Sequence, residues 1–119
     1  KKVSFVKFTN NPYKYINWCD LFILSSKYEG MPNVLIETGY LKKNIISSDC
    51  PTGPSELIKH QHNGYLFKNN SLKSLIKMIN KYKNNKSKIK SANRLNCYIK
   101  KVYNNETNFK KLSNILDKL

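Results

Sequence analysis

Two glutamates flank a predicted turn from a strand into a helix, and their types and spacing could do chemistry. Glu29 stands in the polar loop after the apolar run Leu21–Leu24, and Glu37 stands about one and a half turns into the helix that Pro32 can begin. The chain has only seven acidic residues, so two of them at one turn form a concentration. The alternative interpretation is a pair of solvated carboxylates, because such spacing is common in any sequence.

Carboxylates beside a helix start suit one class of ligand. The first N–H groups of a helix attract phosphate, whereas carboxylates accept hydrogen bonds from sugar or ribose hydroxyls. Gly30 allows the backbone to approach a ligand. Open α/β sheets bind their ligands at the carboxyl ends of the strands, where this turn would lie. The pattern therefore favours a phosphorylated ligand that is rich in hydroxyl groups.

Strands that alternate with helices predict an α/β fold, a Rossmann-like parallel sheet with flanking helices. We expect four parallel neighbouring strands, at Val3–Phe8, Leu21–Leu24, Ile45–Ser48 and Tyr65–Phe67. Helices are expected at 13–18, 32–41, 55–59 (with Ser55 near the cap), 72–79 (capped by Ser71), 89–102 and 109–119, with a polar connection or solvated helix start over 81–90. Domains of this kind usually have more strands, so we expect a further part before Lys1.

The formal net charge of +15 suggests an anionic partner, a nucleic acid or a membrane surface. An AT-rich genome would give the same excess of lysine, because Arg94 is the only arginine and Ala92 the only alanine. A nucleic-acid binder would need aromatic residues interleaved with lysine on one face. The aromatic residues near Lys14 fall where helix packing would use them, so we expect no nucleic-acid partner.

The remaining reactive residues do not predict a metal site. Cys19, Cys50 and Cys97 lie far apart without a CxxC pair, which is typical of buried free thiols in a reducing compartment. His60 and His62 form an HxH pair without further ligands nearby, as expected of a solvated loop. No apolar run approaches the roughly 18–20 residues of a membrane span.

The sequence EGMPNVLIE, residues 29–37, resembles the E-x7-E motif of retaining GT-B glycosyltransferases of the large family four. From residue 11 to 67, NPYKYINWCDLFILSSKYEGMPNVLIETGYLKKNIISSDCPTGPSELIKHQHNGYLF is similar to the family's carboxyl-terminal, donor-binding domain almost without gaps. The resemblance implies that residues 1–84 are part of this Rossmann-like domain and that residues 85–119 are its carboxyl-terminal helices. Thr38 departs from the pattern, because a small alanine is common there.

The resemblance also implies roles for single residues. Glu37 matches the glutamate that holds the ribose hydroxyls of the nucleotide, and Glu29 matches the one beside the transferred sugar, which makes it the implied catalytic residue. The turn whose amides face the diphosphate and sugar matches Gly30, Met31, Pro32, Asn33 and Val34. The implied reaction retains the anomeric configuration, with the leaving diphosphate stabilised by the helix N-terminus and basic groups rather than by a metal. No cofactor is implied; the substrate would be a nucleotide-sugar, by default linked to UDP.

A glycan or lipid-linked acceptor, in the synthesis of envelope or surface polysaccharide such as lipopolysaccharide, is the further implication. This places the protein in the cytoplasm, in peripheral contact with the anionic inner face of the cell membrane. In the family, the acceptor domain and a basic pair that grips the diphosphate precede the part seen here, so we expect a missing amino-terminal domain or a partner chain. The alternatives are a non-catalytic nucleotide- or phosphate-binding remnant and one subunit of a split enzyme.

Overall fold

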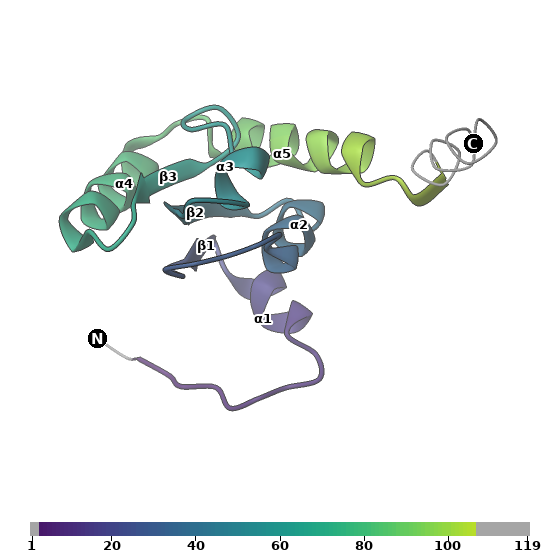
Figure 1. Cartoon of the computed structure of the whole chain (residues 1–119), viewed down its shortest axis with the longest axis horizontal. Helices are drawn as coiled ribbons and strands as arrows, with labels where there is room; N and C mark the ends of the chain where they lie inside the picture. Colours follow the sequence, from purple (N-terminus) through teal and green to yellow (C-terminus); the bar gives the residue numbers. More distant parts are fainter. Residues whose placement is uncertain (1–2, 107–119) are drawn as a thin grey trace.

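The computed structural model describes residues 3–106 and shows a small parallel sheet covered by helices on both faces (Figure 1). In chain order the elements are α1 (Tyr13–Trp18), β1 (Leu21–Leu24), α2 (Asn33–Tyr40), β2 (Asn44–Asp49), α3 (Pro54–Leu57), β3 (Tyr65–Lys68), α4 (Leu72–Asn84) and α5 (Lys88–Val102). The strand order is β1-β2-β3, and both pairs are parallel. The predicted α/β class and three of the four predicted strands are therefore confirmed.

Strand β2 is the centre of the fold, and its consecutive side chains serve two cores. Ile45 packs with residues of α2, α3 and α5, whereas Ile46 packs with β3 and Met78 of α4. The alternation follows from the two-residue period of a strand. Because both faces of β2 are covered, Ser47 and Ser48 are buried as well. The sheet thus holds α2 and α5 on one side and α4 on the other.

Helix α5 packs closely on α2 through a glycine. A Cβ atom at Gly39 would collide with the side chains of Ile99 and Leu95, so only glycine allows this approach. Asn96, also on α5, is buried and donates from Nδ2 to the carbonyls of Gly39 and Tyr40 at 3.2 and 2.7 Å. The last carbonyls of a helix have no N–H of a following turn to accept from. Asn96 donates to two of them, and the carbonyl of Gly39 also accepts from the N–H of Lys42 at 3.0 Å. The end of α2 is therefore anchored to α5.

We expect Asn96→Ala to lower the free energy of unfolding by about 1–3 kcal/mol, because the exchange removes both hydrogen bonds that a buried carboxamide makes to the end of α2. Urea unfolding followed by circular dichroism measures the change. Asn93→Ala is the matched control, since Asn93 lies exposed on the same helix. Equal stability of the two variants would contradict the anchoring role.

The predicted strand at Val3–Phe8 is wrong. These residues form no strand, and the side chains of Phe5 and Phe8 are 96% and 95% exposed. Alternating apolar residues are compatible with a strand, but a strand is stabilised by pairing with a neighbour. Within residues 3–106, β1 pairs with β2 alone, and the amino-terminal segment runs apart from the sheet (Figure 1).

Several helix boundaries differ from the predicted ones. Helix α3 ends at Leu57, because Ile58 is extended, and its cap is Gly53 rather than Ser55. The predicted Ser71 cap is confirmed, since its side chain accepts from the N–H of Ser74 at 3.2 Å. Helix α4 continues to Asn84, through residues that we expected to form a polar connection. The helix predicted at 109–119 lies outside the described residues.

Candidate functional site

The loop after β1 is held in place by residues that follow or end the neighbouring strands. The hydroxyl of Ser48, on β2, donates to the carbonyl of Ser26 at 2.6 Å. The amide of Asn69, just after β3, donates to the carbonyl of Lys27 at 2.7 Å. In a parallel sheet these strand ends lie at one edge, so their loops can meet. The carboxyl edge of the sheet is therefore cross-linked around the segment that carries Glu29.

A second set of contacts seats the turn from Glu29 into α2. The hydroxyl of Thr52 donates to the carbonyl of Glu29 at 2.6 Å. Gly53 has a φ of 89°, and a Cβ atom there would collide with the carbonyl oxygen of Gly30 and press on the ring of Pro32. The loop after β2 can pass this closely only because Gly53 has no side chain. The backbone conformation of the turn is therefore held by contacts with the loop after β2.

Helix α2 begins at Asn33, directly after Pro32, and has no side-chain cap. The prediction of Pro32 within the first turn is wrong by one position, because it is the cap residue, whose carbonyl accepts from the N–H of Leu35 at 2.9 Å. Met31 and Asn33 are exposed, so the helix start opens to solvent. An uncapped helix start presents N–H groups and positive partial charge to an anion.

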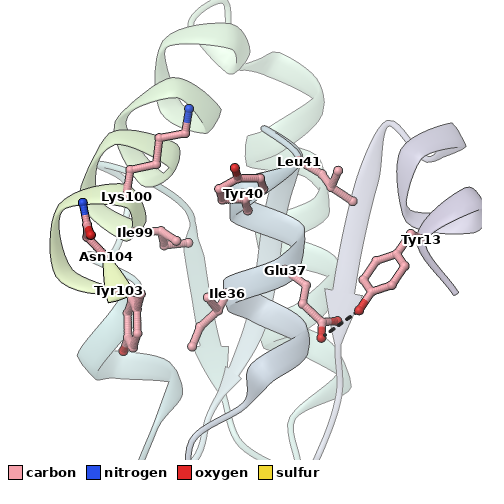
Figure 2. Close-up of a pocket in the computed structure, with 9 residues that line it drawn as sticks. All are labelled: Tyr13, Ile36, Glu37, Tyr40, Leu41, Ile99, Lys100, Tyr103 and Asn104. Atoms are coloured by element: carbon pink, nitrogen blue, oxygen red, sulfur yellow. Dashed lines mark hydrogen bonds between the residues drawn. The ribbon is translucent and has the colours of Figure 1, made fainter. Parts of the chain in front are cut away.

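Glu37 lines a pocket of about 510 Å³ that lies among α1, α2 and the end of α5 (Figure 2). Its Oε1 accepts a hydrogen bond from the hydroxyl of Tyr13 at 3.4 Å. Figure 2 shows the carboxylate pointing toward Tyr13, whereas Ile36 and Tyr40 stand on the side of α2 that faces α5. The other lining residues are Leu41, Ile99, Lys100, Tyr103 and Asn104. Because this hydrogen bond is long and therefore weak, the carboxylate can exchange it for a hydrogen bond from a ligand hydroxyl.

The two predicted glutamates lie on either side of the start of α2, Glu29 in the loop after β1 and Glu37 within the helix. Glu37 lines the pocket beside Tyr13, and Glu29 does not. Glu29 lies half-buried in the loop, and its backbone carbonyl is held by Thr52. Tyr13 is the residue that sequence reasoning missed, since we assigned it to helix packing. Its position as the first residue of α1, directly after Pro12, could have indicated a side chain at the helix edge.

The predicted turn residues differ in their burial. Gly30, Met31 and Asn33 are exposed, Val34 is half-buried, and Pro32 is buried against Gly53. Gly30 has no heavy atom within 4 Å of a Cβ built on it. The turn therefore has open space at the position that a side chain of residue 30 would occupy.

The histidines and cysteines have structural surroundings. His60 Nδ1 accepts from the N–H of Leu66 at 3.0 Å, and burial together with the nearby Lys81 lowers the pKa of His60. No group of three or more His, Cys, Asp or Glu that could hold a metal occurs within residues 3–106. Cys50 is a buried free thiol as predicted, but Cys97 is exposed. No helix in the described part of the chain is long and apolar enough to cross a bilayer.

Two relatives illustrate the sequence similarity of the chain. An N-acetylgalactosamine-N,N'-diacetylbacillosaminyl-diphospho-undecaprenol 4-alpha-N-acetylgalactosaminyltransferase of Campylobacter jejuni is 38% identical over 66 residues, which are 56% of this chain and 18% of the relative. A lipopolysaccharide 1,6-galactosyltransferase of Escherichia coli is 33% identical over 60 residues, which are 50% of this chain and 17% of the relative. The match thus spans less than a fifth of each relative's length.

The fold is also found in a solved glycosyltransferase structure. The crystal structure of Anabaena HepE in complex with UDP superposes with a TM-score of 0.85 at 20% identity, covering 94% of this chain and 31% of HepE. The Rossmann-like arrangement is that of GT-B glycosyltransferases. The model of the family described as Glycosyl transferases group 1 matches residues 1–102. The chain therefore belongs to the glycosyl transferases group 1 family.

Proposed function

We propose that this chain is the nucleotide-sugar-binding part of a glycosyltransferase that acts with retention of anomeric configuration. The observation that carries the proposal is the turn at the carboxyl edge of the sheet, where the uncapped start of α2 lies between Glu29 and Glu37. Such a turn offers N–H groups to a diphosphate and carboxylates to hydroxyls. Family membership supports the same assignment.

The donor is proposed to be a nucleotide-sugar linked to UDP. HepE, whose fold the chain shares, was solved with UDP and with UDP-glucose. Glu37 would accept hydrogen bonds from the two ribose hydroxyls. Glu29 would contact the transferred sugar as the catalytic residue. The amides of the turn from Gly30 to Val34 would face the diphosphate. The departing charge would be stabilised by these amides and by basic groups, without a metal or other cofactor.

The acceptor is proposed to be a glycan or a lipid-linked glycan of the cell envelope. The names of the Campylobacter and Escherichia relatives point to a diphospho-undecaprenol acceptor and to lipopolysaccharide. Such an enzyme would work in the cytoplasm, in peripheral contact with the anionic inner face of the membrane, to which the net charge of +15 is suited.

The matched segments cover 18% and 17% of the two relatives, and the complete enzyme is proposed to include an amino-terminal domain or a partner chain. The same observation favours a second candidate, a nucleotide-binding remnant or a subunit of a split enzyme. Both candidates require binding of a nucleotide at the turn before α2, and they differ in whether sugar is transferred.

Titration of the chain with UDP in a calorimeter tests the site. We expect Glu37→Gln to weaken the binding of UDP by roughly ten- to a hundredfold, because hydrogen bonds to a charged group contribute about 1.5–3 kcal/mol. Asp20→Asn is the matched control, since Asp20 lies exposed directly before β1 and hence at the opposite edge of the sheet. Absence of UDP binding by the unaltered chain, or equal loss in both variants, would refute the proposal.

A further inference from the structure

The charges of this chain are divided unevenly along its length. Residues 1–56 carry seven Lys and five Asp or Glu, whereas residues 57–106 carry twelve Lys or Arg and a single acidic residue, Glu106. A genomic preference for lysine codons acts on the whole chain and would not lower the number of acidic residues between Leu57 and Glu106. The positive charge therefore belongs to the surface that the second half builds, which includes β3, α4 and α5.

Helix α4 presents lysines and aliphatic residues on its outward face. Lys73, Lys77 and Lys81 follow one another at intervals of four residues, which places them along one side of the helix. Leu72 and Ile76 are 71% and 50% exposed and have the same spacing. The residues that α4 contributes to the core are Met78 and, partly buried against it, Leu75, Ile79 and Tyr82. Leu72 and Ile76 are not among them. The outer face is thus amphipathic in its own right.

A hollow of about 800 Å³ lies against this face of α4, between the helix and the start of β3. Its lining includes the three lysines and the carboxamides of Asn80, Asn84 and Gln61. None of the described residues that line it is acidic. Ammonium and amide N–H groups are donors that suit a phosphate oxygen. The hollow therefore fits a phosphate group, and Ile76 at its wall adds an apolar contact.

We infer that the outer face of α4, defined by Leu72, Lys73, Ile76, Lys77 and Lys81, docks on a bilayer that contains acidic phospholipids. The lysines pair with headgroup phosphates, while Leu72 and Ile76 enter the boundary of the acyl chains. The inference deepens the membrane contact proposed above by naming its surface. It does not depend on sugar transfer.

A nucleic acid fits this face less well. Single strands are bound by aromatic side chains on which the bases stack. The aromatic residue in the hollow is Tyr65, which is only 8% exposed and whose hydroxyl accepts from Asn85 Nδ2 at 2.9 Å. The exposed side chains of Leu72 and Ile76 instead offer apolar groups that can enter the boundary of the acyl chains in a bilayer.

The test is co-sedimentation of the 119-residue chain with vesicles of phosphatidylcholine mixed with phosphatidylglycerol, and with vesicles of phosphatidylcholine alone. Each lysine near an acidic bilayer strengthens binding by about fivefold, so removing three should weaken it by roughly a hundredfold. The test variant combines Lys73→Gln, Lys77→Gln and Lys81→Gln. Lys7→Gln, Lys14→Gln and Lys42→Gln together form the control, since they remove the same charge from exposed positions outside α4.

We expect the unaltered chain to bind the vesicles that contain phosphatidylglycerol and not those of phosphatidylcholine alone. The test variant should lose this binding, whereas the control variant should bind nearly normally. The double variant Leu72→Gln with Ile76→Gln should bind more weakly than the unaltered chain. Circular dichroism checks that each variant is folded. No binding to acidic vesicles, an equal loss in both triple variants, or tight binding of single-stranded RNA in place of vesicles would overturn the inference. UDP affinity should stay unchanged in the test variant, so loss of vesicle binding and failure of the nucleotide site are separate outcomes.

Discussion

Gly53→Ala is expected to destabilise the fold by about 3 kcal/mol or more and to displace the turn that carries Glu29. A φ of 89° is strained for a residue with a side chain, at a cost of about 1–3 kcal/mol. The added methyl group would also collide with the carbonyl of Gly30 and press on Pro32, and overpacking costs about 1–3 kcal/mol more. Relief requires the loops after β1 and β2 to separate, which would break the bond from Thr52 to Glu29.

Urea unfolding of the variant measures the stability, and UDP titration reports on the turn. Gly30→Ala is the matched control, because a Cβ atom there has no neighbour within 4 Å. We expect this control to change the free energy of unfolding by less than about 0.5 kcal/mol. If Gly53→Ala is as stable as Gly30→Ala, the close approach of the two loops is wrong.

In the complete enzyme, the two glutamates should affect different kinetic constants. The ribose contact proposed for Glu37 would be made before and during transfer alike, so Glu37→Gln should mainly raise KM, by roughly ten- to a hundredfold. Glu29 is proposed to stabilise the sugar as it detaches, an interaction that is stronger in the transition state. Glu29→Gln should therefore lower kcat with a smaller change in KM.

Steady-state kinetics of both variants with a nucleotide-sugar, in a protein that supplies the proposed amino-terminal domain, measures this division. Asp20→Asn again serves as the control for loss of a carboxylate. If both glutamates were solvated groups near a helix, each would contribute under about 1 kcal/mol. A change in kcat/KM below about threefold for both variants would then show that the assignment of this site is wrong.

The sequence by itself determined most of the local structure. The apolar runs at β1, β2 and β3 are bounded by turn residues, and the spacing of apolar residues in α4 and α5 predicts both helices. The spacing alone did not decide burial, since Leu72 and Ile76 of α4 and Ile89 of α5 are exposed. Ser71 at the start of α4 is a local signal of the same kind. These features depend on neighbours within a few residues, and the EGMPNVLIE motif could be recognised for the same reason.

The tertiary structure alone decided which distant residues meet. Val3–Phe8 has the pattern of a strand, but pairing decides whether a strand forms, and the described chain offers it none. Tyr13 reaches Glu37, 24 residues away, through the packing of α1 beside α2. Gly53 lies close to the carbonyl of Gly30 because β1 and β2 end at the same edge of the sheet. A local pattern specifies which face of an element is apolar, whereas these contacts depend on how the faces are packed together.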